Sequence, residues 1–128
     1  MNQDEFFNIL DNDFPAITTE QELLNGIVAD IRNHWMMISN RISNPKRDLN
    51  VISRSSDSFN AWVEIGINDK TIKAQRIGDN VEVSALSAGV QQATPHKIYI
   101  EDGKVLFDKT NQEFKVNDID FMLEHLLD

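Results

Sequence analysis

Three histidines are the side chains of this sequence best suited to acid–base or metal chemistry. His34, His96 and His125 lie far apart, and no cysteine or second histidine stands at metal-ligand spacing from any of them. A catalytic histidine also needs a positioned partner, which the neighbouring residues do not supply. We therefore expect each histidine to be structural or exposed, and only contacts between distant segments would make one of them catalytic.

The other groups that could do chemistry occur where turns or helix ends are expected. The serine-rich stretch 53–58 falls between two predicted strands, and no G-x-S-x-G elbow occurs. The acid pairs at 11 and 13, 101 and 102, and 118 and 120 do not follow the alternating ligands of an EF-hand loop. No glycine pattern matches a dinucleotide fingerprint or a P-loop. The sequence therefore predicts a non-enzyme with no catalytic residue, no metal and no cofactor.

Length and composition predict one cytoplasmic domain. A chain of 128 residues can bury a substantial core by itself, so we expect a single α+β domain over residues 1–128. The chain has no cysteine, which is typical of a reducing compartment. We also expect no signal peptide and no membrane segment, because no apolar run approaches about 20 residues. These features favour a soluble, cytoplasmic protein.

The charged residues are strongly segregated along the chain. Residues 1–30 hold seven acids and residues 117–128 hold four, and neither segment contains lysine or arginine. The net charge is −9, and no dense basic region is available to neutralise nucleic-acid phosphates. Direct nucleic-acid binding is therefore not expected, whereas a basic protein partner is one interpretation of the acidic ends. The other is that they are solvated helix faces, since net charge alone argues for solubility.

Residues 19–43 carry the clearest helix pattern. Thr19 stands three residues before Glu22, as in a capping box. Apolar residues then recur every three or four positions for about six turns and share one face, namely Leu24, Ile27, Ile31, Trp35, Ile38 and Ile42. Pro45 ends the helix, because the residue before a proline is pushed out of helical geometry. A shorter helix is predicted over 4–10, where it could form a lid on the core.

After Pro45 the apolar period changes from helical to alternating. This pattern predicts strands over 49–54, 59–67, 71–77, 81–86, 97–101, 104–108 and 113–116. Tight-turn residues such as Asp102-Gly103 separate them, so neighbours should be antiparallel. Residues 87–95 are read as a loop, and 117–128 as a closing helix. We therefore predict an α+β fold: a long N-terminal amphipathic helix packed on an antiparallel β-meander of 6–7 strands, closed by a C-terminal helix.

Two surfaces are candidates for binding. Trp62 and Tyr99 alternate out of phase with the inward residues of their strands, and with Lys73 and Arg76 they could form an aromatic, basic patch on the outer sheet face. Ordinary cross-strand packing of two aromatics explains them equally well. The second candidate is the acidic helix faces, whose representative residues are Glu20, Asp30, Asp120 and Glu124.

The leading hypothesis is a non-enzymatic protein-binding or regulatory protein: an adaptor, a chaperone-like protein or an inhibitor. Such a protein would bind a protein partner, for which the acidic helices favour a basic protein, or it would form a homodimer. The alternative is a small-molecule-binding domain with a cavity between sheet and long helix, lined by Trp35, Met36 and Phe107. A third hypothesis is an enzyme that combines His96 with acids and serines from distant strands.

Overall fold

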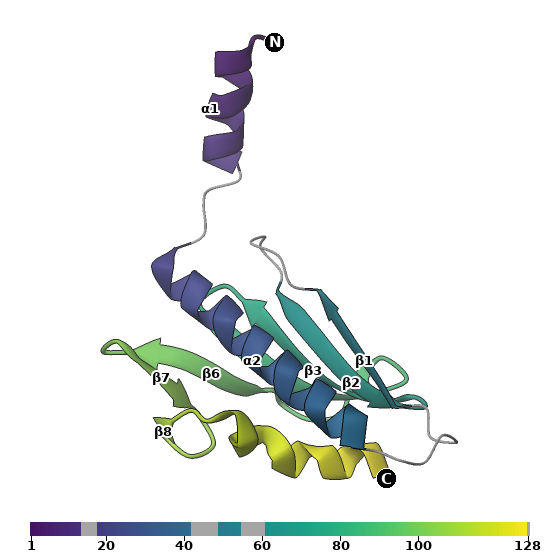
Figure 1. Cartoon of the computed structure of the whole chain (residues 1–128). Coiled ribbons are helices and arrows are strands. Elements are labelled where there is room, and N and C mark those ends of the chain that lie inside the picture. The colour runs from purple at the N-terminus through teal and green to yellow at the C-terminus, as the bar shows by residue number, and fades with distance from the viewer. Residues whose placement is uncertain (14–17, 42–48, 55–60, 128) are drawn as a thin grey trace.

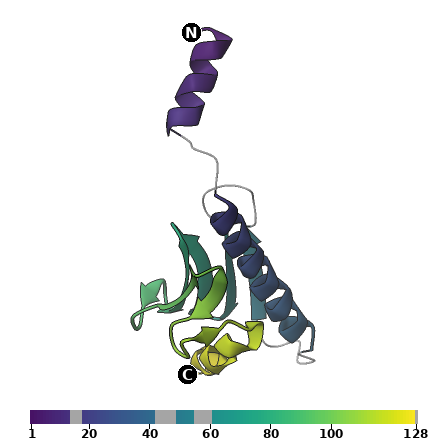
Figure 2. The ribbon, with the colours of Figure 1, turned by 90° about the vertical axis from the view of Figure 1, so that its left-hand side faces the viewer.

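A long helix lies across one face of an antiparallel sheet, and a C-terminal helix lies beside it on the same face (Figure 1; Figure 2). The computed structural model describes residues 1–13, 18–41, 49–54 and 61–127. Helix α1 spans Gln3–Asp13, α2 spans Thr19–Arg41, and the C-terminal helix η1 spans Val116–Leu127. The predicted α+β class is confirmed.

The sheet is a meander in which seven strands pair in chain order. They are β1 (Leu49–Arg54), β2 (Trp62–Ile67), β3 (Lys70–Ile77), β4 (Asn80–Ser87), β6 (His96–Glu101), β7 (Lys104–Phe107) and β8 (Gln112–Glu113). Every pair is antiparallel. The turns are short enough for this, and Asp102 and Gly103 both have the positive φ of a type I′ hairpin.

One short strand lies off this path, inside the segment predicted to be a loop. Strand β5 (Val90–Gln91) pairs with the end of β4 at Leu86 and Ser87. Strand β6 pairs instead with the beginning of β4, from Asn80 to Val83. Strand β4 therefore pairs with β6 at its beginning and with β5 at its end, and residues 92–95 connect β5 to β6.

The core lies between the helices and the inner sheet face. Strands β2, β3 and β4 bury alternate residues, as a half-covered sheet must. Helix α2 buries Leu24, Val28, Ile31 and Trp35 against them. The other large apolar residues Leu23, Met36 and Met37 of α2 do not belong to this face and are 47%, 47% and 57% exposed.

The predicted capping box exists, but one residue earlier than expected. Thr18 Oγ1 accepts from the backbone N–H of Gln21, and Gln21 Oε1 accepts from the backbone N–H of Thr18, both at 3.1 Å. Glu22 instead donates its backbone N–H to the carbonyl of Thr18. Two adjacent threonines left the register ambiguous, and the structure selects the one in which glutamine at the third helical position completes the box.

Two terminal elements differ from the prediction. Helix α1 is not a lid, since it lies apart from the sheet in both views and its described side chains, residues 1–9, are all exposed (Figure 1; Figure 2). The C-terminal helix is a 3₁₀ helix of 12 residues that buries Ile119, Met122 and Leu126. Leu127, next to Leu126 at the end of this helix, is 69% exposed.

Candidate interaction surfaces and a histidine-lined cavity

The outer sheet face carries three of the four residues predicted for it. Trp62, Lys73 and Tyr99 occupy outward positions of β2, β3 and β6, and each is half-buried. The Lys73 ammonium lies 5.2 Å from the centroid of the Trp62 ring, a cation–π contact between neighbouring strands. Lys73 therefore positions Trp62 at the surface.

Arg76 is not part of this face. It shares the inward phase of Ile72 and Ala74 and is only 2% exposed. Its Nε donates to Asn25 Oδ1 of α2 at 2.6 Å, and its Nη1 donates to the carbonyl of Gly78 at 2.8 Å. The guanidinium is thus a polar link between α2 and the sheet. The alternation of β3 already contained this information, because Arg76 lies two residues after Ala74.

The two outer aromatics do not form one cluster. Trp62 pairs with Gln75 of β3, which pairs with Glu82 of β4, which pairs with Lys97 of β6. Tyr99 lies two residues further along β6, so three strand spacings, about 14 Å, separate the two rings across the sheet. A groove of about 390 Å³ lies over this face beside Lys73, and Glu82, Ser84 and Leu86 of β4 contribute to it. The outer face offers separate contact points.

The four predicted acidic residues have different surroundings. Glu20 and Asp30 on α2 are exposed, as expected of a binding surface. Asp120 of η1 accepts a hydrogen bond from His34 of α2, with 2.7 Å between Oδ1 and Nε2, so it links the two helices. Glu124 is exposed and contributes to the wall of a cavity described next.

The cavity is an open cleft beside η1, where β4 changes partner, and has a volume of about 370 Å³. Val83 and Ala85 of β4 line it, together with Ala93 and Thr94 from the segment between β5 and β6. The remaining lining residues are His96, Phe121, Met122, Glu124 and His125. Trp35, Met36 and Phe107, predicted to line a cavity between sheet and α2, do not line this one. Trp35 and Phe107 are buried in the core, whereas Met36 is exposed.

Both histidines of the cavity have partners from distant segments of the chain, a possibility that the sequence prediction left open. His125 Nε2 lies 2.8 Å from the carbonyl oxygen of Leu86. His96 Nδ1 lies 3.5 Å from Asp108 Oδ1, and its ring packs edge-on against Phe121 with centroids 5.3 Å apart. No spacing in the sequence could reveal this convergence, because it depends on the β4–β6 register and on where η1 lies.

The chemistry of this cavity is hydrogen bonding and acid–base. Two imidazoles, the Glu124 carboxylate and the Thr94 hydroxyl converge from two segments of the chain, 94–96 and 124–125. The third hypothesis required titratable groups that share a cleft, and this cavity provides them, although no serine lines it. Among the described residues no group of three or more His, Asp or Glu side chains is placed to hold a metal ion.

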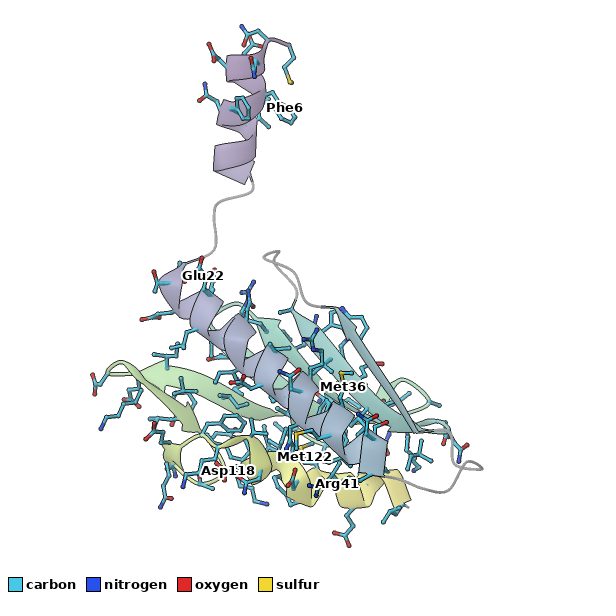
Figure 3. The ribbon with its side chains drawn as sticks, in the orientation of Figure 1. Phe6, Glu22, Met36, Arg41, Asp118 and Met122 are labelled. Atoms are coloured by element: carbon cyan, nitrogen blue, oxygen red, sulfur yellow. The ribbon has the colours of Figure 1, made fainter. Side chains whose placement is uncertain are left out.

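Exposed apolar side chains concentrate on the first two helices. Phe6, Phe7 and Ile9 of α1 are 49%, 49% and 43% exposed, and Phe6 and Phe7 pack edge-on with centroids 5.8 Å apart. Figure 3 shows Phe6 on α1, well away from the sheet. Leu23, Met36 and Met37 add apolar area on α2.

Comparison of the chain with protein-family models, with curated proteins and with solved structures found no match. None of the helices in the described residues is long and apolar enough to cross a membrane. Any functional conclusion therefore rests on the surfaces and the cavity described above.

Proposed function

We propose that the protein is a non-enzymatic, cytoplasmic protein-binding protein that uses its acidic, partly apolar helices to engage a basic protein partner. The observation that carries this proposal is α1, an amphipathic helix whose apolar residues Phe6, Phe7 and Ile9 contact solvent. Removing such side chains from water stabilises a complex by about 1.5–3 kcal/mol each when burial is complete. A groove on another protein would supply that burial.

Charge supports a basic partner over other classes. Asp4 and Glu5 lie in the first turn of α1, and Glu20 and Glu22 lie in the first turn of α2. Residues 1–30 contain no lysine or arginine, so their field attracts a positive protein surface and repels nucleic-acid phosphates. The apolar residues then provide affinity, while the acids provide orientation and a fast encounter.

The role is that of an adaptor, a chaperone-like protein or an inhibitor. A helix that inserts an apolar face into a groove is a recurrent recognition mode, read through residues on one helical face. The outer-face residues Trp62, Lys73 and Tyr99 provide secondary contact points on the same partner or on a second copy of the chain. Homodimerisation competes with partner binding in this scheme, so subunit number belongs in the test.

The test is affinity capture from native lysate with the full chain tagged at its C-terminus. Phe6→Ser/Phe7→Ser should abolish recovery of a basic protein that the natural sequence retains, and Asp4→Asn/Glu5→Gln should reduce it. Capture should weaken as salt rises from about 0.05 to 0.5 M, because exposed charges are screened over shorter distances.

The matched control is Asn8→Ser, an exposed polar position on the same helix, which should retain the partner. Light scattering on the same samples counts subunits. Equal recovery by the natural chain and by Phe6→Ser/Phe7→Ser, or recovery of nucleic acid in place of protein, would refute the proposal.

A further inference from the structure

The cavity beside η1 has the size and lining of a small ligand site. Its volume of about 370 Å³ falls within the range of pockets that hold small molecules. Val83 and Ala85 give it an apolar floor, and Phe121 and Met122 of η1 give it an apolar wall. Polar groups are few and come from His96, His125, Thr94 and Glu124, which is the composition expected where a ligand is oriented by a small number of hydrogen bonds.

The hydrogen bond of one imidazole and the carboxylate beside the other determine which nitrogens of the two rings can accept a hydrogen bond from a ligand. A carbonyl oxygen can only accept, so His125 Nε2 carries a proton that it donates to the Leu86 carbonyl. The Asp108 carboxylate lies 3.5 Å from His96 Nδ1, longer than an ordinary hydrogen bond, and its negative charge favours a proton on that nitrogen. In the neutral rings, His125 Nδ1 and His96 Nε2 are therefore hydrogen-bond acceptors.

The remaining polar groups of the cavity add further hydrogen-bond acceptors. The Glu124 carboxylate accepts only, and the Thr94 hydroxyl can either donate or accept. A ligand that itself only accepts, such as a carboxylate, would find a single side-chain donor. A ligand rich in donors, such as a guanidinium or an alkylammonium, would find acceptors on several sides.

The aromatic wall already holds a cation. The Lys109 ammonium lies 3.3 Å from the centroid of the Phe121 ring, a cation–π contact. Phe121 also lines the cavity and packs against His96. The same aromatic group can contact the apolar stem of a second cation that enters from the cavity side.

We propose that the cavity binds a hydrogen-bond-donating organic cation, a guanidinium or ammonium group on an apolar stem. The cation donates to the acceptor nitrogens of His96 and His125 and pairs with Glu124, while its stem lies on Val83, Ala85 and Met122. Two sources share this chemistry: a free small molecule, or an arginine or lysine side chain of the basic partner. The site is separate from α1, so failure of the α1 substitutions leaves this proposal intact.

The test is an NMR titration of the full ¹⁵N-labelled chain with n-butylguanidinium and n-butylammonium, using n-butyrate and n-butanol as matched controls. The two cations should shift the ring resonances of His96 and His125 with dissociation constants on the order of millimolar, as befits ligands of so few atoms. Glu124→Gln should weaken cation binding about 5-fold or more, because it removes the charge from one acceptor. Glu64→Gln, on the outer face of β2, should leave it unchanged.

The source of the cation is distinguished by a third ligand, a short peptide with one arginine and blocked ends. Binding at least about 10-fold tighter than n-butylguanidinium, a gain of about 1.4 kcal/mol, assigns the site to a partner's side chain. Equal or weaker binding assigns it to a free small molecule. The proposal is overturned if n-butyrate binds as well as the cations, or if Zn²⁺ alone occupies the site through both histidines and the alkyl cations do not.

Discussion

Helices α1 and α2 begin from similar sequences and have opposite surroundings. Both carry two acids in the first turn and apolar residues on one side. In α2, Leu24 and Ile31 are fully buried on the sheet and Trp35 is 1% exposed. In α1, Phe6 and Phe7 each expose 49% of their surface. The difference lies in whether a complementary surface is present, since the apolar pattern exists in both.

An amphipathic pattern thus shows which face of a helix is apolar, but it does not show which surface will bury that face. The 23 residues of α2 are long enough to span the sheet and gain burial along their length. The 11 residues of α1 are fewer than the roughly 12–15 that make an isolated helix even marginally stable in water. Helix α1 therefore contributes little to folding, and its exposed apolar residues are the ones for which we propose a binding partner.

Substitutions on the buried face of α2 should have the largest effect on the free energy of unfolding. Trp35→Ala should lower the free energy of unfolding by about 3–5 kcal/mol, because it removes the largest fully buried side chain of α2 and leaves a cavity. Urea unfolding followed by far-ultraviolet circular dichroism measures this. Met36→Ala, one residue further and 47% exposed, is the matched control and should cost less than about 1 kcal/mol. Similar losses for both would mean that α2 packs through a different face.

A smaller effect is expected for the polar link between α2 and β3. Arg76→Met should cost about 1–3 kcal/mol, because it leaves the Asn25 side-chain oxygen and the Gly78 carbonyl without their donor. Lys73→Met, on the outer face of the same strand, is the control and should cost less than about 1 kcal/mol, since it loses only a partly exposed cation–π contact. If Arg76→Met proved as mild as Lys73→Met, burial of the guanidinium would not stabilise the fold.

Local periodicity was enough to predict most of the fold. The change from helical to alternating spacing after Pro45 located α2 and the sheet, and Asp102-Gly103 located a hairpin that the structure contains. Even Arg76 was predictable from its phase with Ala74, although its charge suggested a surface position. Where the alternation and the charge disagreed, the alternation was right, because Asn25 of α2 accepts a hydrogen bond from the buried guanidinium.

The candidate cavity could not be predicted in this way. His96 comes from a strand, His125 from the C-terminal helix, and Asp108 from the turn that follows β7. Their proximity depends on the change of partner along β4, which no short-range pattern records. Likewise, the sequence contained the apolar residues of α1 but could not show whether the core would cover them. Both the cavity and the exposure of α1 depend on contacts between segments that are far apart in the sequence.

Substitutions of the exposed phenylalanines of α1 should have the smallest effect on the free energy of unfolding. Phe6→Ser/Phe7→Ser should change the free energy of unfolding by less than about 0.5 kcal/mol, because neither ring is packed in the core and surface substitutions seldom matter more. Leu24→Ser in α2 is the contrasting control and should destabilise strongly, since that side chain is fully buried. Urea unfolding of the three proteins provides the values. A loss above about 1.5 kcal/mol for the α1 variant would mean that α1 packs on the body of the protein in solution, and its apolar face would then belong to the fold instead of to a partner.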